Sequence, residues 1–149
     1  YLNVVGREKE GSVMPGAEYE DVRKRIQAGL SALVDPATGE HPIVRVWTRE
    51  ELYSGFDPNQ IPDLRVGTNL NYRVSWQTAL GGAPPEVFED NHKPWSGDHC
   101  SSDPDLVRGI LFSSRKLTKD DPAMIDIAPT ILKFLGVPIP PEMDGKPLL

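Results

Sequence analysis

The sequence predicts a mixed fold, α/β or α+β, in which short strands alternate with helices. Apolar residues recur with helical spacing between residues 19 and 33, whereas residues 43–47 alternate apolar and polar side chains as a strand does. A second helical pattern occupies residues 126–135. The 149 residues are enough for one domain with a sizeable core.

The N-terminal half is expected to contain one long helix among short strands. A turn at residues 14–16 precedes the helix, whose apolar face is Tyr19, Val22, Ile26, Leu30 and Leu33. A loop at residues 35–39 ends it, and a helical turn is expected at residues 50–53. The expected strands are short β-prone runs bounded by turn residues or charges: 2–5, 43–47, 62–66 and 72–76.

The C-terminal half is expected to begin with a long loop, residues 77–105, which contains the pairs Gly81-Gly82 and Pro84-Pro85. Loops of this length are usually functional or disordered. A strand is expected at residues 107–113. The helix at residues 126–135 has Pro129 in its first turn, where a missing N–H costs little, and Gly136 fits the position that ends it.

Composition narrows the class of protein. The chain has 16 basic and 22 acidic residues, a net charge of −6, which argues against a nucleic acid or an anionic membrane as the main partner. No apolar run is long enough for a membrane helix. The single Cys100 excludes an intrachain disulfide and a multi-cysteine zinc site, and favours a reducing, cytoplasmic compartment. Because the chain begins at Tyr1, we expect it to be a piece of a longer protein.

Few side chains suggest chemistry by themselves. The sequence has no Gly-rich phosphate loop, HExxH, CxxC or GxSxG motif. His41 precedes a proline and is expected in an exposed turn, and His92 is expected either in a solvated loop or at a substrate. The acidic residues near the long loop and the second helix are expected in loops or caps: Asp103, Asp105, Asp120, Asp121 and Asp126.

His99 follows Asp98 in the segment Trp95-Ser96-Gly97-Asp98-His99, at the end of the long loop. A neutral imidazole there could complete a zinc or manganese site. One histidine is not a metal site, however, because a catalytic zinc needs about three protein ligands. The residues alone therefore favour an ordinary loop pair.

The order of the segments carries more information than any one of them. The chain resembles the C-terminal part of a type I phosphodiesterase/nucleotide pyrophosphatase, a branch of the alkaline phosphatase superfamily, over nearly its whole length. The resemblance implies that residues 1–149 form the C-terminal portion of an alkaline-phosphatase-like α/β sandwich, with short strands and packing helices. The segments that carry it are Asn3-x-x-Gly6-Arg7-Glu8-x-Glu10-Gly11, Pro62-Asp63-Leu64, Trp95-Ser96-Gly97-Asp98-His99, Gly109-Ile110-Leu111, Asp126-Ile127-Ala128-Pro129-Thr130-Ile131-Leu132, Leu135-Gly136-Val137-Pro138 and Met143-Asp144-Gly145-Lys146.

The resemblance also implies a dinuclear metal centre. Enzymes of this family hold two divalent ions, usually zinc, through Asp and His ligands, and attack phosphorus with Thr or Ser. His99 matches the last ligand, whereas Asp98 does not match one, because the preceding residues are too polar and Cys100 replaces a glycine. His92, Trp95 and Asp98 are substrate-side candidates. The nucleophile and the other ligands are expected upstream, so the isolated segment should be inactive and bind zinc poorly.

The favoured function is part of a metal-dependent phosphodiesterase or nucleotide pyrophosphatase that acts on a small nucleotide-type phosphate ester. The alternatives are another hydrolase or a phosphomutase of the same superfamily, acting on phosphomonoesters or sulfate esters, and a non-catalytic α/β interaction module. A piece of a larger sheet leaves strand edges uncovered, so we also expect the fragment to self-associate.

Overall fold

The computed structural model describes residues 1–55, 57–92, 101 and 103–149. They form helices and a two-stranded antiparallel sheet, which confirms the predicted mixed α/β class. The chain divides into two compact units, Tyr1–Val107 and Arg108–Leu149. Among the described residues, no helix is both long and apolar enough to span a bilayer.

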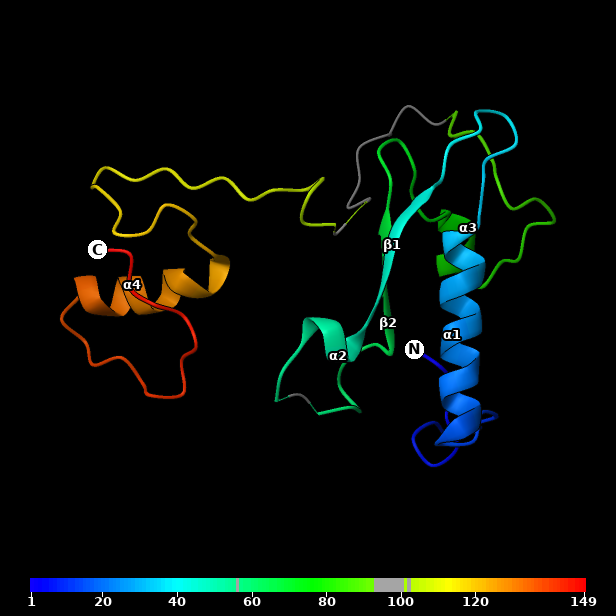
Figure 1. Cartoon of the computed structure of the whole chain (residues 1–149), viewed down its shortest axis with the longest axis horizontal. Coiled ribbons are helices and arrows are strands. Elements are labelled where there is room, and N and C mark those ends of the chain that lie inside the picture. Colours follow the sequence, from blue (N-terminus) through cyan, green and yellow to red (C-terminus); the bar gives the residue numbers. More distant parts are fainter. Residues whose placement is uncertain (56, 93–100, 102) are drawn as a thin grey trace. The chain divides into compact units, whose positions relative to one another are not determined.

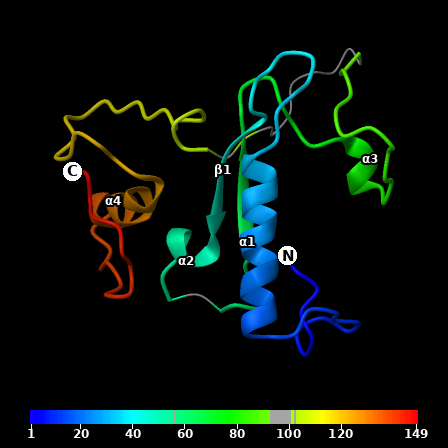
Figure 2. The ribbon, with the colours of Figure 1, turned by 45° about the vertical axis from the view of Figure 1, so that its right-hand side comes forward.

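The first unit is built on helix α1 (Ala17–Ser31) and the antiparallel strands β1 (Ile43–Thr48) and β2 (Leu64–Thr68) (Figure 1). The strands pair in the register Val46↔Val66, and α1 lies alongside β1 (Figure 2). The predicted face of α1 is confirmed for Tyr19, Val22, Ile26 and Leu30, which are buried or half-buried, whereas Leu33 lies beyond the end of the helix. The small apolar core of this unit is Val4, Tyr19, Val46 and Trp47.

Two one-turn helices complete the first unit. Helix α2 (Arg49–Leu52) begins one residue before the predicted turn, and the Glu51 carboxylate accepts the Thr48 N–H at 2.6 Å in a capping box. Helix α3 (Trp76–Ala79) begins after Ser75, whose Oγ accepts the Gln77 N–H at 3.2 Å. The strand predicted at residues 72–76 is therefore wrong, because the Ser75 cap starts a helix within a β-prone run.

Two further strand predictions fail. Residues 2–5 form only isolated bridges, Val4↔Val13 and Val5↔Glu8. Residues 107–113 adopt no regular structure, and the exposed fractions of Ile110 and Phe112 are 82% and 91%. A strand requires a neighbour for its backbone hydrogen bonds, and no other described segment pairs with residues 107–113.

The second unit contains the one-turn 3₁₀ helix η1 (Met124–Asp126) and helix α4 (Ile127–Phe134). Pro129 is buried in the first turn of α4, as predicted. At the other end the Val137 N–H donates to the Leu132 carbonyl (2.9 Å) and the Gly136 N–H to the Lys133 carbonyl (3.1 Å). Gly136 has φ +69°, so this pair is a Schellman motif and confirms the predicted helix end.

Candidate functional site

One of the predicted site residues lies among the residues that the structure describes, and the other three lie outside them. His99, Trp95 and Asp98 lie outside the described residues, so the metal-ligand assignment of His99 stays a prediction. His92 lies in an exposed segment without regular structure. Within the described ranges, no group of three or more His, Cys, Asp or Glu side chains is placed to hold a metal ion.

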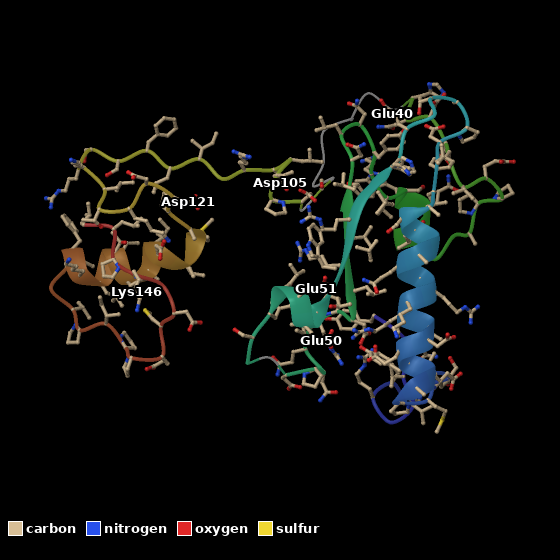
Figure 3. The ribbon with its side chains drawn as sticks, in the orientation of Figure 1. Glu40, Glu50, Glu51, Asp105, Asp121 and Lys146 are labelled. Atoms are coloured by element: carbon tan, nitrogen blue, oxygen red, sulfur yellow. The ribbon has the colours of Figure 1, made fainter. Side chains whose placement is uncertain are left out.

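Ser101, two residues after His99, is hydrogen-bonded to the sheet. Ser101 Oγ donates to the Thr68 carbonyl at the end of β2 (2.8 Å) and accepts the Asp103 N–H (3.2 Å). Farther along, the Asp105 carboxylate lies 3.9 Å from the Arg45 guanidinium of β1, and both side chains are exposed. Asp105 is labelled in Figure 3. Ser101 and Asp105 are therefore both held by residues of the β1–β2 pair.

Asp103 is the least ordinary residue of this connection, because its side chain is fully buried. Its Oδ1 accepts the Asp105 N–H at 2.9 Å, whereas its Oδ2 is buried without a hydrogen-bond partner. The space it fills exists because residue 67 is glycine: a Cβ there would stand 3.0 Å from the Trp47 ring and 3.3 Å from the Asp103 Cβ.

A second buried carboxylate, Asp63, has its hydrogen-bonding capacity filled. Arg7 binds it in a bidentate manner, with both N–O distances 2.7 Å. The Leu2 N–H (2.6 Å) and the Tyr19 hydroxyl (2.8 Å) also donate to it, and Arg49 lies 3.3 Å away. Burial raises the pKa of Asp63, but these donors outweigh it and hold the pKa well below the usual range.

We call Asp63 and the side chains bonded to it, Arg7, Tyr19 and Arg49, the Asp63 cluster. Further contacts connect this cluster to α1 and α2. Arg23, buried on α1, contacts Glu50 of α2 (2.9 Å) and donates to the Tyr19 hydroxyl (3.1 Å); Figure 3 labels Glu50. Burial opposes ionisation of Glu50, yet the hydrogen bond from Arg23 lowers its pKa to about 2. The cluster thus joins the N-terminal segment, the helix and the sheet. We assign it a structural role, because its carboxylates are engaged by guanidinium groups.

A pocket of about 260 Å³ opens beside the Asp63 cluster. Its lining consists of Val4, Arg7, Pro15, Gly16, Tyr19, Arg49 and Pro58. The two guanidinium groups in this lining form ion pairs with Asp63, and each also pairs with a glutamate, Glu8 or Glu50. Because acidic side chains already compensate both charges, the pocket offers little attraction to a phosphate.

In the second unit, two of the motifs that carry the resemblance are bonded to each other. Asp126 accepts the Lys146 N–H at 2.8 Å and the Ala123 N–H at 2.9 Å, and Lys119 Nζ lies 2.8 Å away. The hydrogen bond from Lys119, followed by those from Ala123 and Lys146, holds the pKa of Asp126 below its usual range. The Lys146 side chain is visible in Figure 3 beside α4.

The same contact continues through neighbouring residues. Thr130 Oγ1 accepts the Leu148 N–H at 2.9 Å, and a Cβ on Gly145 would lie 2.0 Å from the Ile125 carbonyl oxygen. We call these residues the C-terminal clasp: Asp126, Thr130, Gly145, Lys146 and Leu148. The Asp-Ile-Ala-Pro-Thr and Met-Asp-Gly-Lys motifs therefore fasten the chain end to α4, which is a structural task. Sequence analysis singled out both motifs by resemblance but did not anticipate that they meet.

Comparison with known proteins gives partial matches of one kind. A 2,3-bisphosphoglycerate-independent phosphoglycerate mutase of Onchocerca volvulus is 53% identical over 61 residues, which are 38% of this chain and 12% of that protein. The same enzyme of Agrobacterium fabrum is 41% identical over 54 residues (36% and 11%), and that of Synechococcus elongatus 32% over 80 residues (48% and 15%). No family model matches the chain, and no solved structure matches it.

The chain thus spans a small part of the length of the relatives it matches. These relatives are phosphomutases of the alkaline phosphatase superfamily, so the matches support that superfamily. They favour the predicted phosphomutase alternative over the phosphodiesterase that the motif order suggested. The matched proteins are enzymes of phosphoryl transfer, and the matches give no specific support for hydrolysis or for zinc.

Proposed function

We propose that this chain is part of a metal-dependent phosphoryl-transfer enzyme of the alkaline phosphatase superfamily, of the phosphomutase type, acting on a small phosphorylated substrate. The observation that carries the proposal is the 53% identity over 61 residues with a phosphoglycerate mutase. The order of motifs along the chain supports the same superfamily. Among the described residues, Ser101, two positions after His99, hydrogen-bonds to Thr68 at the end of β2 and to Asp103.

In this proposal His99 is a metal ligand, and His92, Trp95 and Asp98 lie on the substrate side. Divalent ions supply Lewis-acid chemistry in such a site, because they polarise the phosphoryl oxygens and stabilise the charge that develops during transfer. The described residues contribute the framework: Ser101 fixes the chain after His99 to β2, and Asp103 places a buried carboxylate there. The nucleophile and the remaining ligands are proposed to come from outside this chain.

A phosphodiesterase or nucleotide pyrophosphatase is the second candidate. It is favoured by one observation, the sequence Trp95-Ser96-Gly97-Asp98-His99 followed by Gly109-Ile110-Leu111, in the order that family uses. Both candidates share the metal chemistry, so the substrate distinguishes them.

The test uses the full-length protein with two substrates, a phosphoglycerate and a chromogenic phosphodiester, each with and without added divalent metal. We expect metal-dependent interconversion of phosphoglycerates, and we expect His99→Ala to abolish it. His41→Ala is the matched control, because His41 is exposed and away from the predicted ligand loop in sequence. Turnover of the diester alone would select the second candidate. Unchanged turnover in His99→Ala would refute the ligand assignment, and no turnover of either substrate would favour a non-catalytic module.

A further inference from the structure

Residues 108–112 expose apolar side chains and unpaired backbone together. The exposed fractions of Ile110, Leu111 and Phe112 are 82%, 42% and 91%. Within the part of the chain that the structure describes, none of the backbone N–H or C=O groups of residues 108–112 forms a hydrogen bond. Contiguous exposed apolar side chains of this kind mark a surface that another chain segment covers. The backbone beside them is available for pairing with that segment.

The composition of residues 108–112 indicates what kind of partner fits them. In a strand, the β-prone Ile110 and Phe112 would lie on one face and Leu111 on the other. A strand with apolar residues on both faces is typical of the interior of a sheet that is covered on both sides. No charged residue occurs between Arg108 and Arg115, whereas edge strands usually carry a charge or a proline that prevents further pairing. These features favour an interior strand over an edge strand.

A second copy of this chain does not provide such surroundings. Two 108–112 segments paired with each other would form a two-stranded ribbon, which is marginally stable in water and leaves both faces uncovered. The chain spans only a small part of the length of the relatives it matches. The remaining length of such a protein is enough for further strands and for the layers that cover them. The partner that fits is therefore a sheet formed by the rest of a longer protein.

We propose that residues 108–112 form an interior strand of a sheet whose other strands lie outside this chain in the full-length protein. The partner is recognised by strand addition: the backbone N–H and C=O groups of two neighbouring strands pair with those of residues 108–112. Apolar side chains cover Ile110 and Phe112 on one face and Leu111 on the other. This inference goes beyond the proposed function, because it concerns how the chain joins the remainder of the protein and does not depend on the reaction.

Hydrogen exchange of the full-length protein, followed by mass spectrometry, measures the pairing directly. We expect the amides of residues 110–112 to exchange about 10³-fold or more slowly than unstructured amides, because exchange from an interior strand requires large-scale unfolding. Residues 86–88 are the internal reference. They also lack regular structure and Val87 is 75% exposed, but prolines and acidic residues flank them. They should exchange at nearly the unstructured rate.

Ile110→Asp in the full-length protein tests the apolar contacts. Val87→Asp is the matched control, because both side chains are β-branched and are exposed to a similar degree in this structure, 82% and 75%. A carboxylate buried without a partner is costly. If Ile110 is covered in the full-length protein, Ile110→Asp should therefore lower the urea midpoint of unfolding strongly or prevent folding, whereas Val87→Asp should leave the midpoint unchanged. Where Ile110→Asp does not fold, hydrogen exchange of the wild type decides.

Three outcomes would overturn this inference. The first is exchange of the amides of residues 110–112 at the unstructured rate. The second is a wild-type urea midpoint in Ile110→Asp. The third is protection of residues 110–112 that disappears when the protein is diluted to a monomer, which would assign the surface to a second copy. None of these readouts depends on activity, so the proposed function stands or fails separately, on the substrate test.

Discussion

Replacing Asp63 by Asn should strongly destabilise the first unit. The two side chains have the same shape, so the change removes the charge and turns one acceptor into a donor. That amide nitrogen would face Arg7 Nη2 or the Leu2 N–H, which now lie 2.7 and 2.6 Å from Asp63 Oδ2. Breaking a buried, hydrogen-bonded ion pair in this way costs about 3–5 kcal/mol, a large share of the stability of a small domain.

Tryptophan fluorescence during urea unfolding measures this loss, because Trp47 is buried in the first unit and Trp76 belongs to the same unit. Asp21→Asn is the matched control: its ion pair with Arg25 on α1 is 3.6 Å long and exposed, and should contribute less than about 1 kcal/mol. A loss below 1 kcal/mol in Asp63→Asn, or equal losses in both variants, would refute the structural role of the cluster.

The effect of Asp63 should also depend on pH. Its folded-state pKa is lower than the unfolded value of about 3.9, so the ionised carboxylate stabilises the fold fully above that value. As the pH falls from the unfolded pKa toward the folded one, Asp63 takes up a proton in the unfolded chain first, and the stabilisation declines. The difference between wild type and Asp63→Asn should therefore be largest near neutral pH and shrink in acid.

Three glycine substitutions give further predictions. Gly145→Ala should destabilise the second unit by about 1–3 kcal/mol, because its Cβ would overlap the Ile125 carbonyl; faster hydrogen exchange in α4 would show this, and unchanged exchange would contradict the clasp. Gly136→Ala should cost about 1 kcal/mol by the same measurement, because φ is +69°. Gly29→Ala, in the interior of α1 with open space around it, should instead stabilise the first unit by about 0.5–1 kcal/mol, and a lower urea midpoint would contradict this.

Local patterns predicted the elements whose causes are local. The spacing of apolar residues located α1, and the proline and glycine at either end located α4, because helix propensity and capping act within a few residues. The strand predicted at residues 107–113 failed for the opposite reason. Its apolar residues are β-prone, but a strand forms only with a partner, and none of the described segments provides one.

Long-range pairing limited what could be predicted of the site. The helical pattern of residues 19–33 did not indicate a partner for Arg23, and the structure buries it against Glu50, 27 positions away. Asp103 was expected as a loop or cap residue, and it does close a turn. Its burial depends on Gly67 and Trp47, from strands paired across the fold, which no local pattern indicates. The assignment of His99 stays a prediction.

The bonding of Asp126 to Lys146 has a consequence for what the two motifs can indicate. Lys146 and Leu148 are held through their backbone N–H groups, and Gly145 packs closely against the Ile125 carbonyl. None of these contacts involves a substrate. The two motifs therefore indicate how this unit is fastened and do not by themselves indicate a substrate.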